Sequence, residues 1–192
     1  MGKIFYISDA HVSHKNILKF DNRPFKTIEE NDETIMRNWN SVVTNDDLVV
    51  SLGDMHWGKD DEVYEYVKQL NGRKIAIRGN HSIKHPSKKL RSLFEDYCDY
   101  KEITDDGRHI ILSHYPIMFY KAAYNPYCYM LCGHVHTTRE NSFLEQWTNE
   151  LRNTRCNSGD SYGNIINVGA MMPWMDYTPR TLDEIIAAKG WE

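Results

Sequence analysis

The chain has 192 residues, of which 41% are hydrophobic and 26% are charged, and its formal net charge is −4. This length suits a single domain over residues 1–192, and the net charge argues against a protein that binds polyanions over its whole surface. No apolar run approaches the ~18–20 residues that span a bilayer, and the first residues lack the apolar region of a signal peptide. We therefore expect a cytoplasmic protein that does not bind membranes. The sequence leaves its oligomeric state open.

Strand-like and helix-like patterns alternate through the first half of the chain. Residues 3–8 form a β-rich run, and a helix then begins at Thr27 with a capping box in which Glu30 reaches back. Four apolar residues at helical spacing predict the buried stripe of that helix: Ile28, Ile35, Trp39 and Val42. The elements expected next are a strand at 47–52, a helix at 60–70, a strand at 73–78 and a short helix at 87–94.

Strands dominate the second half. Two of them, at 100–104 and 109–113, are joined by the hairpin turn Asp105-Asp106-Gly107, and the remaining elements are strands at 127–132 and 165–168 and a closing helix from Thr181 with a capping box to Glu184. Residues 138–163 are polar and rich in Asn and Ser, which predicts a surface helix and loop inserted before the last strand. Strands followed by helices favour an α/β or mixed sheet sandwich over an all-β barrel.

The chain contains four cysteines, and Cys128 and Cys132 are spaced C-x3-C within an apolar stretch. No second cysteine pair accompanies them to complete a zinc site. A domain of this length does not need disulfides, so we expect ordinary buried thiols.

Polar side chains with metal-binding chemistry come directly after the predicted strands. The groups, in chain order, are Asp9-Ala10-His11, Gly53-Asp54, Gly79-Asn80-His81, Ser113-His114 and Gly133-His134-Val135-His136. Ligands in open α/β folds gather at the carboxyl ends of strands, so these side chains are predicted to meet at one rim. Glycine at positions 53, 79 and 133 suits tight turns close to a metal.

Seven of these side chains offer oxygen or imidazole donors suited to zinc, iron or manganese: Asp9, His11, Asp54, Asn80, His114, His134 and His136. The i, i+2 spacing within D-x-H and H-x-H places both side chains of a pair on one face. Seven ligands exceed the needs of one tetrahedral ion, and two ions that share a carboxylate would use them all. Each motif alone is more often a turn or a helix cap, and only the complete ordered set is distinctive.

The ordered set D-x-H, G-D, G-N-H, H and G-H-x-H, over residues 9–136, resembles the signature of the calcineurin-like metallophosphoesterase family. The segment Asn167-Val168-Gly169, with the later Leu182-Asp183-Glu184-Ile185, is similar to the end of small prokaryotic and phage members. The resemblance implies an α/β (α+β-like) fold. In this fold two mixed β-sheets, flanked by helices, form a four-layer α/β/β/α sandwich.

The resemblance also implies a role for each motif residue. Asp9, His11 and His136 would bind one divalent ion, Asn80, His114 and His134 a second, and Asp54 would bridge them. A hydroxide held between two ions ~3.5–4 Å apart would attack phosphorus, with His81 on the leaving-group side as general acid or electrostatic donor. We expect both bound ions to be manganese, with iron, nickel or zinc as alternatives.

One position departs from the family pattern. The family has Asp or Glu after the G-N-H motif, and this chain has Ser82. A serine can fix a histidine tautomer by hydrogen bonding, but it cannot stabilise an imidazolium by charge. The leaving-group preference is therefore open.

Candidate substrate contacts are His14, Arg23, His56 and Tyr115, each close in sequence to a predicted ligand. The run 81–91 contains Lys and Arg but no acid, and is either a solvated helix face or a surface that docks phosphates. The aromatic residues of 115–129 either pack in the core or, where exposed, stack on a base.

The sequence predicts a metal-dependent phosphoesterase acting on a small phosphoester, with phosphodiesters of nucleotide type favoured by family analogy. The alternatives are a phosphomonoesterase of the same mechanism and a non-catalytic binding scaffold, which should show eroded ligands. A short single-stranded nucleic acid remains a candidate partner, whereas the net charge of −4 disfavours a large basic groove.

Overall fold

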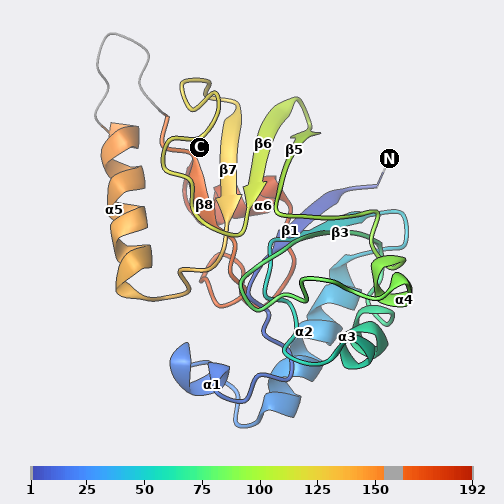
Figure 1. Cartoon of the computed structure of the whole chain (residues 1–192). Coiled ribbons are helices and arrows are strands. Elements are labelled where there is room, and N and C mark those ends of the chain that lie inside the picture. The colour runs from blue at the N-terminus through green and yellow to red at the C-terminus, as the bar shows by residue number, and fades with distance from the viewer. Residues whose placement is uncertain (1, 154–161, 192) are drawn as a thin grey trace.

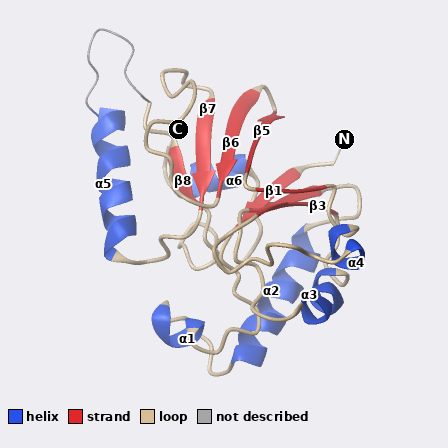
Figure 2. Cartoon of the chain, in the orientation of Figure 1, coloured by secondary structure: helices blue, strands red, loops and turns tan. Residues whose placement is uncertain are grey.

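Two four-stranded β-sheets face each other in the computed structural model, which describes residues 2–153 and 162–191, and helices lie on their outer sides (Figures 1 and 2). The strands of the first sheet lie in the order β1 (Ile4–Ile7), β2 (Leu48–Ser51), β3 (Arg73–Ile77) and β4 (Asp96–Cys98). All three of its strand pairs are parallel. Parallel neighbours bring the ends of successive strands, and the loops that follow them, to the same edge.

The second sheet is mixed, and its order is β5 (Tyr100–Asp105), β6 (Arg108–Ser113), β7 (Cys128–Cys132) and β8 (Ile165–Asn167). The β5–β6 pair is an antiparallel hairpin, and the other two pairs are parallel. Its two-residue turn has Asp106 and Gly107 at φ 47° and 75°, the left-handed conformation that Asp-Gly hairpin turns adopt. The predicted four-layer α/β sandwich is confirmed, but only one of its two sheets is mixed, because the first sheet is wholly parallel.

Six helices connect or flank these strands in the described residues: α1 (Ile17–Phe20), α2 (Ile28–Val42), α3 (Asp60–Val67), α4 (Lys88–Arg91), α5 (Arg139–Asn153) and α6 (Leu182–Ala188). The helices α2, α3 and α4 lie on the outer side of the first sheet, and α5 stands beside the second sheet (Figure 1). Neither α1 nor β4 was predicted from the sequence. No helix in the described part of the chain is long and apolar enough to cross a membrane.

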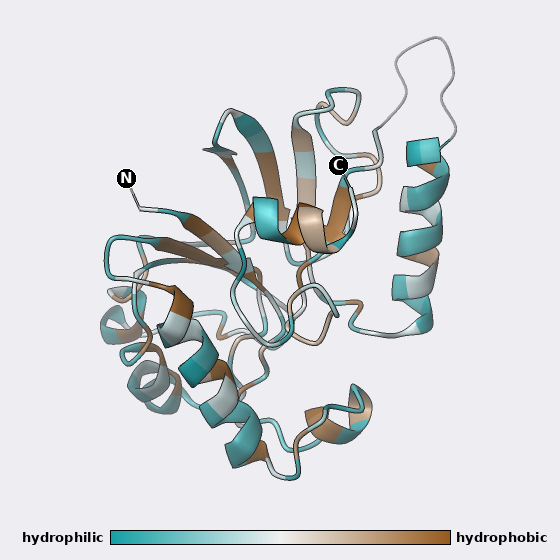
Figure 3. Ribbon diagram, turned by 180° about the vertical axis from the view of Figure 1, so that it is seen from behind, coloured by the Kyte–Doolittle hydropathy of each residue, from teal (hydrophilic) through white to brown (hydrophobic). Residues whose placement is uncertain are grey.

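The main core lies between the two sheets and under α2 and α3. Alternation along β6 shows the layering, because Ile110 and Leu112 belong to the main core while Ile111 faces a smaller cluster. That cluster includes Leu144 of α5, whose remaining surface is mostly hydrophilic (Figure 3). The prediction of a surface helix within 138–163 is confirmed for α5, while residues 154–161, with Cys156, lie outside the described residues. Cys128 and Cys132 are buried free thiols, as predicted.

Two local predictions for α2 need correction. Val42 is 36% exposed and Val43 is 2% exposed, because the helix ends at Val42 and the extended backbone of Val43 turns that side chain into the core. The Thr27 hydroxyl accepts from the Glu30 N–H as expected, but the Glu30 carboxylate accepts from the N–H of Lys26 and not from that of Thr27. The capping box predicted at Thr181 and Glu184 is complete.

A partly buried hydrogen bond joins the two sheets. The Tyr6 hydroxyl, on β1, donates to Asp105 Oδ2, at the end of β5, over 2.9 Å. Tyr6 is fully buried, so the bond lies at the edge of the main core.

We predict that Tyr6→Phe lowers the free energy of unfolding by about 1 kcal/mol, since a typical internal hydrogen bond contributes about that much. Urea denaturation followed by circular dichroism measures the change. Tyr129→Phe is the matched control, because the Tyr129 hydroxyl has no hydrogen-bond partner among the described residues, and it should leave the free energy of unfolding nearly unchanged. Equal losses in the two variants would contradict the assignment.

Candidate metal centre

The carboxyl ends of five strands meet where the two sheets come together. A backbone hydrogen bond of 2.8 Å from the Ser8 N–H to the Val168 carbonyl joins the loop after β1 to the loop after β8. Loops after β1, β2, β3, β6 and β7 bring in the seven predicted ligands.

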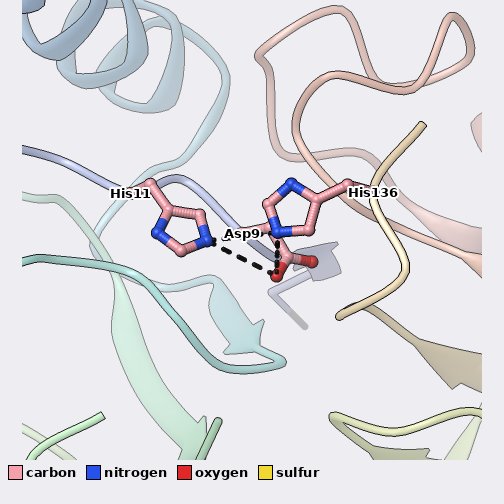
Figure 4. Close-up of side chains that lie close together, drawn as sticks. All are labelled: Asp9, His11 and His136. Atoms are coloured by element: carbon pink, nitrogen blue, oxygen red, sulfur yellow. Dashed lines mark hydrogen bonds and ion pairs between the residues drawn. The ribbon is translucent and has the colours of Figure 1, made fainter. Parts of the chain in front are cut away.

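The first group consists of Asp9, His11 and His136, which point toward one another (Figure 4). Asp9 Oδ1 lies 3.9 Å from His11 Nε2 and 3.6 Å from His136 Nε2, and these two nitrogens are 3.3 Å apart. All three side chains are buried. One carboxylate and two imidazoles thus converge on a single point.

The second group lies beside the first. His114 Nε2 is 3.4 Å from Asp54 Oδ2 and 3.0 Å from Asn80 Oδ1, and the same amide oxygen lies 2.9 Å from His134 Nδ1. Asp54 Oδ2 is also 3.9 Å from His11 Nε2, so this carboxylate lies between the two groups. Asp9, Asp54 and His114 also converge closely enough to hold an ion, so Asp9 too is within reach of both groups.

The donors fit divalent cations. Asp9 Oδ1 is buried and has no hydrogen-bond partner in the described part of the chain, which is costly for a carboxylate oxygen unless a cation meets it. Burial and the neighbouring His136 lower the pKa of His11 to about 2, which keeps this imidazole neutral, the form that binds metal. Mixed carboxylate, imidazole and amide donors suit manganese, iron, nickel or zinc.

Outer partners fix which histidine nitrogens face the centre. His114 Nδ1 donates to the Leu52 carbonyl over 2.8 Å, and His136 Nδ1 lies 2.8 Å from Asp21 Oδ1. In both residues Nε2 is left for a metal, the usual arrangement of metal-binding histidines. Burial opposes the charged form of His136, but the hydrogen bond to Asp21 and the charges of Asp9 and Asp21 together outweigh it and raise the pKa. Sequence reasoning missed Asp21, which lies in none of the motifs.

Arg23 is not free to bind substrate, contrary to the prediction. Its side chain is fully buried, and its three nitrogens donate to Asp21, to Asn31 and to the carbonyls of Asp9 and Ala10. These five contacts use all five N–H groups of a guanidinium. Arg23 therefore fixes the backbone of the first motif, and it also binds the carboxylate that orients His136.

Backbone strain concentrates at the predicted ligands. Five of the seven have positive φ between 45° and 70°: Asp9, His11, Asp54, His134 and His136. This left-handed region costs a non-glycine residue roughly 1–2 kcal/mol, somewhat less for Asp and His. Backbone hydrogen bonds offset this cost, and one of them runs from the His11 N–H to the Asp54 carbonyl over 2.9 Å. Strain of this kind is typical of functional sites.

Two of the three predicted glycines are required by close approach to a carboxylate. A Cβ at Gly79 would lie 2.2 Å from Asp54 Oδ1, and a Cβ at Gly133 would lie 2.2 Å from Asp9 Oδ2. Any side chain would push the carboxylate out of place. Tight turns were expected at these positions; the structure adds that the ligands leave no room for a Cβ.

His81 and Ser82 have separate tasks. The His81 ring is exposed on the cavity next to the ligands, and its backbone N–H donates to Asp54 Oδ1 over 2.9 Å. The Ser82 hydroxyl accepts from the Gly79 N–H at 2.9 Å and, weakly, from the Asp54 N–H at 3.4 Å. In the described part of the chain, no side chain is hydrogen-bonded to the His81 imidazole. Ser82 therefore supports the Asp54 loop, and it does not replace the family carboxylate as a partner of His81.

Of the other predicted substrate contacts, His14 and Tyr115 lie next to the predicted ligands, and His56 does not. His14 lines the same cavity as His81, with Nδ1 3.4 Å from His11 Nδ1. The half-exposed ring of Tyr115 contacts those of His134 and His114, at centroid distances of 4.5 and 5.1 Å. His56 is buried beneath the site, where burial lowers its pKa to about 4, and it lines an internal cavity away from the ligand face.

The basic run and the aromatic run each divide into two parts. Lys89 lies 3.7 Å from Asp61 and Arg91 3.6 Å from Asp96, so part of the basic run packs against acidic neighbours, while Lys84 is exposed beside Asn80. Tyr120 is buried, whereas four other aromatic residues of 115–129 are 49–84% exposed: Tyr115, Phe119, Tyr124 and Tyr127.

Comparison with known proteins gives a family and several relatives. Residues 3–182 match the model of the calcineurin-like phosphoesterase superfamily domain. An uncharacterized protein of Methanocaldococcus jannaschii is 46% identical over 83 residues, 42% of this chain and 47% of that protein. The Gene 66 protein of Mycobacterium phage L5 is 31% identical over 134 residues, 60% of this chain and 64% of that protein. The chain thus spans less than two thirds of the length of either relative.

A crystal structure of a protein of unknown function from Aquifex aeolicus has the same fold. The two superpose with a TM-score of 0.68 at 27% identity, and the match covers 97% of this chain and 99% of that one.

We predict that Asp21→Asn weakens metal binding by about 10–100-fold, the usual effect of removing an outer carboxylate partner of a ligating histidine. Titration of the chelator-treated protein with Mn²⁺, followed by calorimetry, measures the affinity. The control is Asp47→Asn, which removes another buried carboxylate that binds backbone N–H groups far from the ligands. The prediction fails if the two variants bind Mn²⁺ as tightly as the parent protein.

Proposed function

The chain belongs to the calcineurin-like phosphoesterase superfamily, and we propose that it is a dinuclear metal-dependent phosphodiesterase acting on nucleotide-type esters. The observation that carries the proposal is the pair of adjoining ligand groups, with the Asp54 carboxylate 3.4 Å from His114 Nε2 and 3.9 Å from His11 Nε2. A carboxylate between two sets of donors suits a residue shared by two ions.

The ligand assignment follows from these contacts. Asp9, His11 and His136 would hold one ion, Asn80, His114 and His134 the other, and Asp54 would bridge, with Asp9 near enough to support both. Bound divalent ions would supply Lewis acidity and an activated water. We propose manganese, with iron, nickel or zinc as alternatives.

The chain's own residues act around the reacting phosphate. Hydrolysis forms a bond from a water oxygen to phosphorus and breaks the bond from phosphorus to the ester oxygen, and the departing alkoxide must take up a proton. His81 is exposed on the cavity and is the proposed donor of that proton. The backbone N–H of His81 donates a hydrogen bond to Asp54 Oδ1, and this bond holds His81 beside the carboxylate that is proposed to bridge the ions.

Charge favours a diester over a monoester. The cavity over the ligands has a volume of about 240 Å³, and its lining in the described residues includes no lysine or arginine. A phosphomonoester carries about −1.5 to −2 charges at neutral pH, whereas a diester carries one, and so demands less compensation from the protein. The burial of Arg23 removes the cation that the sequence offered as a substrate contact.

The alternatives are a phosphomonoesterase and a non-catalytic scaffold. A scaffold would be expected to have lost ligands, and all seven are present at the strand ends. This intact set supports catalysis.

We predict that chelator-treated protein does not hydrolyse bis-p-nitrophenyl phosphate and that added Mn²⁺ restores hydrolysis. The experiment sets bis-p-nitrophenyl phosphate, p-nitrophenyl phosphate and 2′,3′-cyclic nucleotides against Mn²⁺, Fe²⁺, Ni²⁺ and Zn²⁺. A higher kcat/KM on the diesters supports the phosphodiesterase, and a higher value on p-nitrophenyl phosphate supports the monoesterase. No hydrolysis with any metal would support the scaffold.

We predict that His81→Ala lowers kcat about 10²–10⁴-fold on a diester with an alkoxide leaving group and only a few-fold on bis-p-nitrophenyl phosphate, because nitrophenolate leaves without a proton. His85→Ala is the control, an exposed histidine on the same loop that does not line the cavity. Equal losses on both substrates would rule out proton donation by His81.

A further inference from the structure

Two exposed aromatic side chains stand on either side of the ligand groups. Trp57 is 45% exposed and Tyr115 is 49% exposed, and they come from the loops after β2 and β6. Each ring packs against an imidazole of the site while leaving much of its surface to solvent. Neither residue belongs to the main core.

Trp57 lies beside the first ligand group. Its indole stacks on the ring of His14 with centroids 4.4 Å apart and planes 12° apart, and His14 Nδ1 is 3.4 Å from His11 Nδ1. The ring of His81 lies 4.8 Å from the indole. Trp57 also lines an open cavity of about 760 Å³ that it shares with His81 and Lys59.

Tyr115 lies beside the second group. Its ring contacts His134 edge-on with centroids 4.5 Å apart, and it lines a cavity of about 390 Å³ together with Asn80, Arg78 and Lys84. The central cavity over the ligands borders the Trp57 cavity at His81 and the Tyr115 cavity at Asn80. Both outer cavities therefore adjoin the cavity over the ligands.

Exposed aromatic rings next to a phosphate-binding centre suit nucleobases. Every base has a π-face, and stacking on an aromatic side chain contributes to binding without reading sequence. Arg78, Lys84 and Asp99 line the Tyr115 side, where Arg78 is ion-paired with Asp99, and the remaining positive charge of Lys84 favours an anionic chain. Both features suit a phosphodiester that carries a nucleoside at each end.

We propose that the substrate class is a dinucleoside phosphodiester, free or within a single strand, whose two bases stack on Trp57 and Tyr115. This rests on the proposed phosphodiesterase function. The base of the leaving nucleoside lies on Trp57, because His81, the proposed proton donor to the leaving oxygen, borders that cavity. The other base lies on Tyr115.

The test compares KM and kcat of the Mn²⁺-loaded protein and its Trp57→Leu and Tyr115→Leu variants on a dinucleotide and on a nucleoside methyl phosphate. Each variant is expected to raise KM for the dinucleotide about tenfold or more, as loss of one stacked base predicts, with kcat within twofold. Trp57→Phe should restore most of the lost affinity, since it retains a ring. The nucleoside methyl phosphate has one base, so it should respond to one of the two leucine variants and not to both.

Phe119→Leu is the matched control. Phe119 is 84% exposed but packs against Trp147 of α5, and it lines none of the three cavities. Its KM values should equal those of the parent protein. Thermal melting of all variants confirms that they are folded, and quenching of tryptophan fluorescence by the dinucleotide should be weaker in Trp57→Leu than in the parent protein.

The outcomes separate this inference from the proposed function. If the parent protein hydrolyses no phosphodiester with any metal, the proposed function fails. If it hydrolyses the dinucleotide and both leucine variants keep the parent KM, only the base-stacking inference fails. A lower KM on an eight-nucleotide single strand than on the dinucleotide would assign the substrate to nucleic acid, and equal values would assign it to the free dinucleotide.

Discussion

Two buried carboxylates, Asp9 and Asp54, lie at the junction of the two sheets, and the surrounding structure holds them next to imidazole nitrogens. A buried charge without a partner costs several kcal/mol, and burial raises the pKa of Asp9 accordingly. Close approach of Asp54 to Gly79, and of Asp9 to Gly133, leaves no room for a Cβ at either glycine. The fold thus gives up local stability to gather donors that divalent cations would satisfy.

A second layer behind the ligands makes this arrangement rigid. Asp21 binds His136 through one oxygen and Arg23 through the other, and Arg23 in turn holds the carbonyls of Asp9 and Ala10. One buried ion pair therefore orients a predicted ligand from the loop after β7 and fixes the strained backbone after β1. Ligands of a metal centre that are positioned in this way need little reorganisation when substrate binds.

The surroundings of the centre bear on its proposed chemistry. Without lysine or arginine in the lining of its cavity, as far as the chain is described, the site suits a singly charged phosphodiester. The aromatic rings of Trp57 and Tyr115, in the two adjoining cavities, lie outside the ligand groups, on loops after β2 and β6. In this arrangement the shared ligand set would serve the reaction, while neighbouring loops would select what is attached to the phosphate.

The sequence by itself determined the donors, their order and their position at strand ends, because strand periodicity and short motif spacing are local properties of the chain. It also predicted seven of the eight strands and the helices of more than one turn. It could not assign the structural roles of Arg23 and Asp21, since the Asp21–His136 contact joins residues 115 positions apart. The exposure of Val42, the separation of Ser82 from His81 and the place of Trp57 beside the ligands were likewise decided by tertiary packing. Each depends on which distant segments meet, and pairing of that kind leaves no periodic signal in the sequence.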